Sequence, residues 1–245
     1  MKARKQHVVL TAKRLFLEKG FVHTSVQDII EESNISKGTF YNYFSSKNDC
    51  IIAILQLAKD EEVTRRHELM IGADFSKKDI FIKQILLSFQ INQEFNLLPI
   101  FETIAHSSDL ELRRFVNDLY LKELSWIKKR LIDIYGKEAN PYSADCAIIL
   151  YGMVKQMIHT WRSYKKENIN YYQLIEYAMN RIDTIIHHLI ESKETFFKDP
   201  LLLKVNRTQS VPSKKKLIDE LIQFHDIVRH HNQLSTDTEE YIQFL

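Results

Sequence analysis

The segment from residue 24 to residue 47, TSVQDIIEESNISKGTFYNYFSSK, constrains the fold more than any other part of the chain. Its apolar residues Val26, Ile29 and Ile30 recur at helical spacing, which predicts a helix over residues 26–33. Thr24 is expected to cap this helix, with Gln27 three residues later as its partner in a capping box.

A tight turn and a second helix are expected to follow directly. Asn34 tolerates a left-handed backbone and marks the turn, and Ser36 can cap a helix over residues 37–44. Phe40 and Phe44 are four residues apart and can both face inward. The outward positions are then Lys37, Gly38, Tyr41 and Asn42. Two short helices joined in this way are typical of a helix-turn-helix DNA reader, whose second helix enters the major groove.

Residues 8–54 resemble the N-terminal DNA-binding domain of TetR-family transcriptional regulators. The resemblance rests on positions at fixed spacing across roughly a fifth of the chain: Val8, Val9, Ala12, Leu15, Phe16, Gly20, Phe21, Thr24, Ser25, Val26, Ile29, Ile35, Ser36, Gly38, Thr39, Tyr41, Tyr43, Phe44 and Lys47. The chain departs from the family pattern at Thr11, Ile30, Asn34 and Cys50. None of these departures removes a group expected to face DNA.

The side chains of the segment suggest individual contacts with DNA. Lys37 can donate to guanine, Gln27 can pair with adenine or phosphate, and Tyr41 can reach a base edge or a thymine methyl group. Thr39, Tyr43 and Lys47 are better placed for phosphate oxygens. The full set of candidate DNA-binding residues is Thr24, Ser25, Gln27, Ser36, Lys37, Gly38, Thr39, Tyr41, Asn42, Tyr43 and Lys47.

The chain as a whole is expected to be all-α, because Gly20, Gly72 and Gly136 each follow a helical pattern and its 4 Pro fall near breaks between patterns. Further helices are expected over residues 5–19, 47–70, 79–92, 97–105 and 109–135, followed by two more around residues 147–161 and 174–190. We therefore expect a DNA-binding domain over residues 1–48, a ligand-binding and dimerisation domain over residues 49–194, and a C-terminal extension over residues 195–245. The extension carries one amphipathic pattern, over residues 214–231.

The last two helices before the extension have apolar stripes with near-heptad spacing, which favour pairing with another helix. The resemblance implies that they form a four-helix bundle with their copies from a second subunit. The expected interface residues are Tyr151, Val154, Ile158, Trp161, Ile182, Ile185 and Leu189. The alternative is that these stripes are buried within a single subunit.

The resemblance also implies a small-molecule effector, expected to be apolar or aromatic, whose binding releases DNA. Phe89, Phe101, Trp126 and Tyr151 are candidates for the walls of an apolar pocket. The alternative for each of them is a place in the ordinary core.

Several other classes of function are excluded by what the sequence lacks. It contains no GxGxxG, P-loop, HExxH or GxSxG pattern, so we expect no catalytic residues, metal site or cofactor. Its 2 Cys are far apart and no apolar run is long enough to span a bilayer, so a cytoplasmic protein is expected.

The sequence therefore predicts a homodimeric repressor that binds a palindromic double-stranded DNA operator. Two alternatives remain open: a DNA-binding structural or division-control factor without an inducer, and a helical protein–protein adaptor.

Overall fold

The computed structural model describes residues 2–105, 107–164 and 169–197, and within these ranges the all-α prediction is confirmed. The helices are α1 (Lys2–Glu18), α2 (Val26–Glu32), α3 (Lys37–Tyr43), α4 (Lys47–Glu68), α5 (Lys78–Glu94), α6 (Leu98–Ala105), α7 (Leu110–Tyr135), the short 3₁₀ helix η1 (Lys137–Ala139), α8 (Ser143–Tyr164) and α9 (Tyr171–Ser192). The predicted helix borders over the first seven helices differ from these by three residues or fewer.

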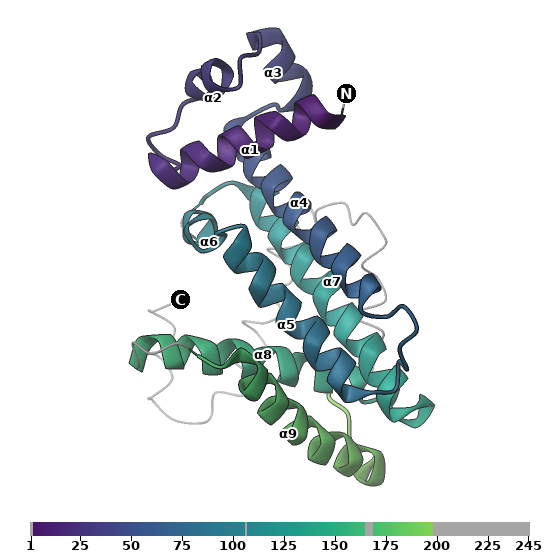
Figure 1. Ribbon diagram of the computed structural model, residues 1–245. Helices are drawn as coiled ribbons and strands as arrows, with labels where there is room; N and C mark the ends of the chain where they lie inside the picture. Colours follow the sequence, from purple (N-terminus) through teal and green to yellow (C-terminus); the bar gives the residue numbers. More distant parts are fainter. Residues whose placement is uncertain (1, 106, 165–168, 198–245) are drawn as a thin grey trace, which may run out of the picture. The chain divides into compact units, whose positions relative to one another are not determined.

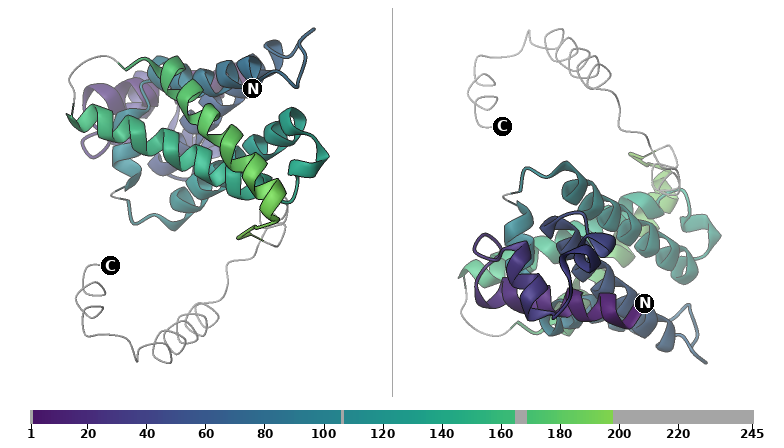
Figure 2. Two further views of the ribbon diagram at one scale, coloured as in Figure 1. Left: turned by 90° about the horizontal axis from the view of Figure 1, so that it is seen from below. Right: turned by 90° about the horizontal axis from the view of Figure 1, so that it is seen from above.

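Helix α1 packs on α2 and on α4, α2 packs on α3, and α4 continues away from them alongside α5 and α7 (Figure 1). Helices α8 and α9 pack on each other and lie together against α7 and α5, as the left view of Figure 2 shows. The chain leaves α1 at Gly20, whose φ of +82° is a left-handed conformation that glycine adopts without a steric cost. This glycine ends α1 and turns the chain toward α2.

Two hydrophobic clusters form most of the core. The first joins α1 to α4 through Val8, Leu15, Phe40 and Ile54, all of which are buried. The same cluster continues into residues from α5 to α7, namely Ile91, Leu97, Ile100, Ile104 and Leu112. The domain boundary that we expected between residues 48 and 49 is therefore crossed by continuous apolar packing.

The second cluster joins α5, the C-terminal half of α7, α8 and α9, with Phe81, Leu131, Leu150 and Ile182 at its centre. Arg130 is buried beside this cluster and all three of its hydrogen bonds are internal: Nε to Gln84 at 3.0 Å, one terminal nitrogen to Asp133 at 2.9 Å and the other to the Phe75 carbonyl at 3.0 Å. A buried guanidinium needs such partners, because an unpaired buried charge is strongly unfavourable.

The described chain ends just after α9, where its last residues are held by Asp145 of α8. The Asp145 carboxylate accepts hydrogen bonds from the backbone nitrogens of Phe196 at 2.7 Å and Phe197 at 3.2 Å. Most of the extension expected over residues 195–245, including the helix expected over residues 214–231, lies outside the described residues. None of the helices within the described ranges combines the length and apolarity needed to cross a membrane.

Candidate nucleic-acid interface

Helix α2 begins with a capping box formed by Ser25 and Asp28. The Asp28 nitrogen donates to Ser25 Oγ at 3.0 Å, and the Ser25 nitrogen donates to the Asp28 carboxylate at 2.7 Å. The Ser25 hydroxyl also donates to this carboxylate, and its two hydrogen bonds from the Ser25 side chain and backbone lower the pKa of Asp28 to about 2. The expectation that Thr24 and Gln27 form this box was wrong by one position.

Thr24 instead closes the preceding loop. Its hydroxyl donates to the Gly20 carbonyl at 2.8 Å and to the Leu15 carbonyl at 3.3 Å, and the residue is 1% exposed. The Thr24 side chain is therefore buried in this loop, and its contact with DNA stays a prediction. Gln27 is exposed on α2, where its amide donates to Glu31 at 2.7 Å.

The turn between α2 and α3 has the predicted conformation, with Asn34 at a φ of +51°. Ser36 caps α3 as expected, since its Oγ accepts from the Thr39 nitrogen at 3.1 Å. Helix α3 ends one residue earlier than predicted, and Phe44 is its C-cap.

The two faces of α3 differ in the predicted way. Phe40 and Phe44 are buried in the first hydrophobic cluster, whereas Lys37, Gly38 and Asn42 are exposed and Tyr41 is 50% exposed. The Tyr41 and Phe40 rings form an edge-to-face pair with centroids 5.4 Å apart. This contact orients the Tyr41 ring, half of which remains exposed to solvent. One face of α3 thus carries the side chains of Lys37, Tyr41 and Asn42, and Gly38 on the same face has no side chain.

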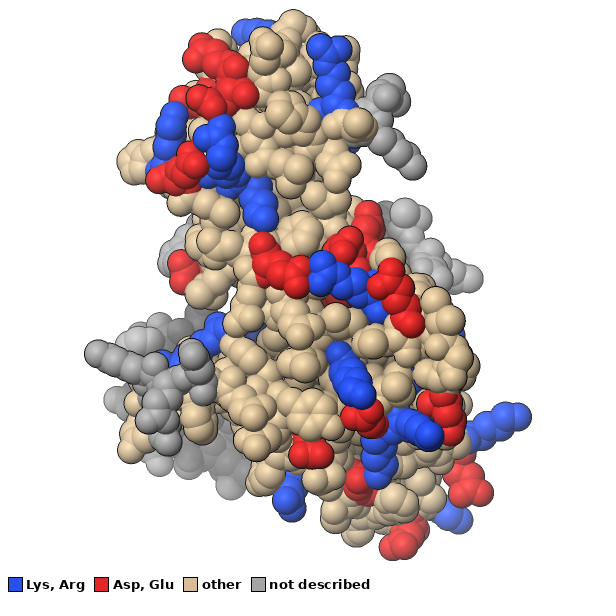
Figure 3. Space-filling model, in the orientation of Figure 1, with Lys and Arg blue, Asp and Glu red and all other residues tan. Residues whose placement is uncertain are grey.

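Lys37 has no carboxylate partner among the described residues, unlike several charged residues of α1, α2 and the loop between them. Arg14 pairs with Glu32 at 2.6 Å, and Lys19 pairs with Asp28 at 3.3 Å. Lys37 takes part in none of the ion pairs formed between described residues. On the face shown in Figure 3, acidic and basic side chains of the described residues are interspersed and form no extended basic patch.

Two further candidates, Tyr43 and Lys47, are partly buried. Tyr43 packs against the first hydrophobic cluster. The Lys47 ammonium donates to the carbonyls of Phe21 at 2.6 Å and Thr24 at 2.7 Å. Burial lowers the pKa of Lys47, with Asp28 opposing that effect. Lys47 thus has a structural role that we did not anticipate, and its contact with phosphate stays a prediction.

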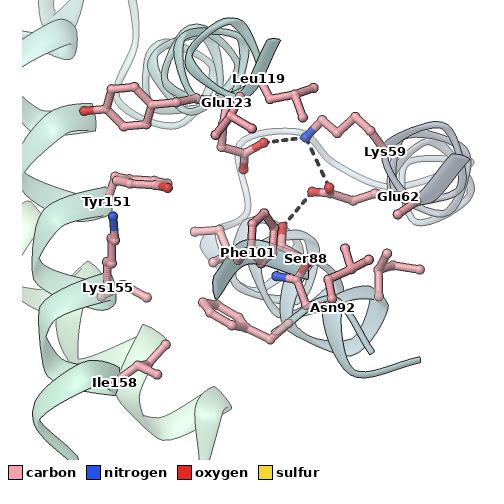
Figure 4. A pocket seen from close by; sticks show the side chains of 18 of the residues that line it. Lys59, Glu62, Ser88, Asn92, Phe101, Leu119, Glu123, Tyr151, Lys155 and Ile158 are labelled. Carbon is pink, nitrogen blue, oxygen red and sulfur yellow. Dashed lines mark hydrogen bonds and ion pairs between the residues drawn. The ribbon is translucent and has the colours of Figure 1, made fainter. Parts of the chain in front are cut away.

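A cavity of about 560 Å³ lies among α4, α5, α6, α7 and α8. Three of the four expected wall residues, Phe89, Phe101 and Tyr151, line it. Trp126 does not line it, because its ring packs against the Arg66 guanidinium, 3.5 Å from the ring centroid, and against Phe81. The cavity also has a polar wall that we missed, made by Lys59, Glu62, Ser88 and Glu123 and shown in Figure 4.

The expected interface residues on α8 and α9 occupy two different environments. Val154, Ile158 and Ile182 are buried within the chain, and Tyr151 lines the cavity, so the place of these four in a subunit contact stays a prediction. Trp161, Ile185 and Leu189 are partly exposed. Other large apolar residues on these helices are more open: Tyr164 at 85%, Tyr177 at 49% and Ile149 at 38%.

Comparison with known proteins places this geometry in context. Residues 9–54 match the family described as "Bacterial regulatory proteins, tetR family". The chain is 28% identical over 201 residues to the uncharacterized HTH-type transcriptional regulator YuxN of Bacillus subtilis (strain 168), covering 80% of this chain and 68% of that protein. It is 24% identical over 196 residues to the uncharacterized HTH-type transcriptional regulator YerO of the same strain, covering 78% of this chain and 68% of that protein.

The fold has solved counterparts. A crystal structure from Mesorhizobium loti MAFF303099, described as that of a TetR-family transcriptional regulator, superposes with a TM-score of 0.57 at 15% identity. The superposition covers 76% of this chain and 96% of the other.

Proposed function

Because residues 9–54 make this chain a member of the tetR family of bacterial regulatory proteins, we propose that it is a homodimeric repressor that binds a palindromic operator and leaves it when a small molecule binds. The chain is a DNA-binding regulator of transcription and not an enzyme. The observation that carries the proposal is the exposed face of α3, formed by Lys37, Gly38, Tyr41 and Asn42. Helix α3 contains no acidic residue that would repel a phosphate backbone.

In this proposal α3 enters the major groove and reads base edges. Lys37 donates to guanine, Tyr41 contacts a base edge or a thymine methyl group, and Gly38 allows close approach of the backbone. Ser25, Gln27, Ser36, Thr39, Asn42, Tyr43 and Lys47 complete the proposed contacts, through phosphates and neighbouring bases. A second subunit related by a two-fold axis reads the other half-site, roughly 34–36 Å away or a multiple of that distance.

The proposed dimer contact uses the outer face of α8 and α9. Ile149 and Gly152 lie three residues apart on α8, and a Cβ atom added at Gly152 would meet no atom within 4 Å. A glycine with open space above it lets the backbone of a partner helix approach closely. Tyr177 and the partly exposed Ile185 and Leu189 supply apolar surface on α9.

The proposed effector site is the cavity, and the first hydrophobic cluster connects it to the reader. Ile91 and Leu97 line the cavity, and both belong to the cluster that also contains the buried residues of α1, α2 and α3. An effector that displaces Ile91 or Leu97 therefore acts on the packing that orients α3. Such a molecule shifts the protein away from DNA only if it binds one arrangement more tightly than the other.

The test is a binding titration of the purified protein on the DNA upstream of its own gene, repeated at several salt concentrations. We expect affinity to fall steeply with salt. Lys37→Ala and Tyr41→Ala should each cost about 1–3 kcal/mol and relax the preferred sequence, whereas the matched control Lys129→Ala on α7 should change neither.

Two other outcomes correspond to the alternative functions. Sequence-specific binding that no small molecule relieves would identify a factor without an inducer. Absence of salt-dependent binding to any duplex would contradict the proposal and favour a protein–protein adaptor.

A further inference from the structure

The cavity of the proposed effector site is mostly apolar inside. Leu55, Ile85, Phe89, Leu119, Ile127 and Val154 contribute to its walls. A volume of about 560 Å³ lies within the range of small-molecule sites in proteins. The main body of any molecule that fills this space must therefore be apolar.

The polar groups of the inner wall already satisfy each other. Glu123 accepts from Lys59 at 2.7 Å and from Arg66 at 2.6 Å. Glu62 accepts from Lys59 at 3.1 Å and from the Ser88 hydroxyl at 2.6 Å, and it forms an ion pair with Arg66 at 2.5 Å. The group thus contains two carboxylates and two cations.

This balance leaves the inner wall with little attraction for a charged ligand. Burial alone would raise the pKa of Glu123, but the charges and hydrogen bonds of Arg66 and Lys59 outweigh burial and lower it to about 2. Glu123 therefore stays ionised and paired. A cationic ligand would have to displace Lys59 or Arg66, and an anionic head placed there would meet two carboxylates.

The exposed part of the cavity lining differs from the inner wall, because it carries basic side chains and no paired carboxylate among the described residues. Lys155, His159 and Arg162 of α8 line the cavity and are exposed. Their spacing of four and then three residues places them on one face of the helix. Neither Lys155 nor Arg162 pairs with a carboxylate of any described residue, and Arg162 has one hydrogen bond, to the Tyr171 hydroxyl at 2.9 Å. Figure 4 shows Lys155 beside Tyr151, across the cavity from Lys59 and Glu62.

We infer that the cavity binds an amphipathic monocarboxylate, with its apolar body among α4, α5 and α7 and its carboxylate between Lys155 and Arg162. The inference rests on the proposed function in taking this cavity as the effector site. Arg162 suits a planar carboxylate because a guanidinium can donate two parallel hydrogen bonds, and Lys155 adds a point charge. A neutral amphiphile of the same length lacks these contacts.

The test measures binding of dodecanoate, dodecanol and dodecyltrimethylammonium to the full chain by calorimetry, each below the concentration at which it aggregates. Dodecanoate should bind at least about tenfold more tightly than dodecanol, and dodecyltrimethylammonium should bind least. Added salt should reduce this preference, because the proposed ion pairs lie at an exposed position.

Variants then assign the preference to the two cations. Lys155→Gln combined with Arg162→Gln should reduce the dodecanoate-to-dodecanol ratio to about one while dodecanol affinity stays unchanged. Arg162→Lys should retain part of the preference. The matched control is Lys122→Gln combined with Lys129→Gln, which removes two exposed lysines of α7 that do not line the cavity and should preserve the full ratio.

Equal affinity for dodecanoate and dodecanol, tighter binding of the cation, or an undiminished ratio in the Lys155 and Arg162 variant would each overturn the inference. A parallel titration on operator DNA without any amphiphile keeps the two proposals separate. If dodecanoate binds through Lys155 and Arg162 but the protein binds no DNA, the ligand class holds and the proposed function fails. If DNA is bound and dodecanoate is not, the reverse conclusion follows.

Discussion

The ammonium group of Lys47 lies over the ring of Phe21, 4.2 Å from its centroid, and donates to the carbonyl of the same residue. Lys47 is the first residue of α4, whereas Phe21 follows α1, so the contact joins the start of one helix to the loop after another. The Thr24 carbonyl accepts a second hydrogen bond from this ammonium. The loop that precedes the DNA reader is therefore held by the Lys47 side chain as well as by the hydroxyl of Thr24.

Replacing Lys47 by methionine should destabilise the protein as well as weaken DNA binding. The change keeps the apolar stem but removes two charge-assisted hydrogen bonds and a cation–π contact, so we expect a loss of about 1–3 kcal/mol in the free energy of unfolding. Denaturant titration measures it. Lys37→Met is the matched control, since Lys37 is exposed and should affect DNA binding alone. Equal stability of the two variants would contradict the structural role of Lys47.

Replacing Ser25 at the N-terminus of α2 should lower the stability of the protein, whereas replacing Gln27 should leave it nearly unchanged. Ser25→Ala removes the acceptor for the Asp28 nitrogen and should cost about 1 kcal/mol of stability. Gln27→Ala removes a surface hydrogen bond and should stay within about 0.5 kcal/mol of the unmodified protein. Thermal unfolding of both variants distinguishes the observed Ser25–Asp28 capping box from the Thr24–Gln27 box expected from sequence. A larger loss of stability in Gln27→Ala than in Ser25→Ala would favour the Thr24–Gln27 box.

The inner wall of the cavity should make stability depend on pH in the acid range. The pKa of Glu123 is lowered from 4.5 to about 2, so the folded state favours the ionised form. The resulting stabilisation is fully present above pH 4.5 and is lost as the pH falls toward 2, with an upper limit of about 3 kcal/mol. In Glu123→Gln the difference from the unmodified protein should be largest near pH 6 and shrink below pH 4.

Glu191→Gln on α9 is the control for this pH dependence, because Glu191 is exposed. Urea titrations of all three proteins at several pH values provide the measurement. A constant difference between the Glu123 variant and the unmodified protein from pH 6 to pH 3 would show that Glu123 is not stabilised as an ion.

Subunit association should be sensitive to Ile149. Ile149→Asp places a charge on the proposed contact face, and burial of an unpaired charge between subunits would be strongly unfavourable. We expect a folded monomer by size-exclusion chromatography with light scattering and unchanged far-ultraviolet circular dichroism. Ile71→Asp, at a position 82% exposed after α4, should remain dimeric. A dimeric Ile149 variant would place the subunit contact elsewhere.

The same reasoning distinguishes Ile149 from Ile182, which is fully buried within the subunit. Ile182→Asp should unfold the chain and not merely dissociate a dimer. Its circular dichroism therefore tests whether Ile182 belongs to the core of the chain or to the subunit contact expected from sequence.

Local signals predicted most of the reader correctly. The left-handed Asn34, the Ser36 cap and the opposed faces of α3 each depend on residues within a few positions of one another, and the structure confirms all three. The capping box was wrong because Thr24-to-Gln27 and Ser25-to-Asp28 have the same spacing. Only the tertiary hydrogen bonds from Thr24 to Leu15 and Gly20 separate these alternatives.

Contacts between distant parts of the chain could not be read from spacing. The pairing of Lys59 and Arg66 with Glu123 spans about sixty residues, so no local sequence pattern indicates a charged wall beside an apolar cavity. The apolar stripe of α8 likewise does not reveal whether Val154 and Ile158 face their own subunit or another. A periodic pattern identifies a buried face but not its partner.

Ile91 and Leu97 belong both to the cavity wall and to the hydrophobic cluster of the DNA-binding helices, so binding at the two sites can be coupled. If an occupant of the cavity lowers the affinity for operator by some factor, thermodynamic linkage requires operator to lower the affinity for that occupant by the same factor. A candidate effector can therefore be recognised without following transcription at all, by comparing its dissociation constant in the absence and presence of saturating duplex.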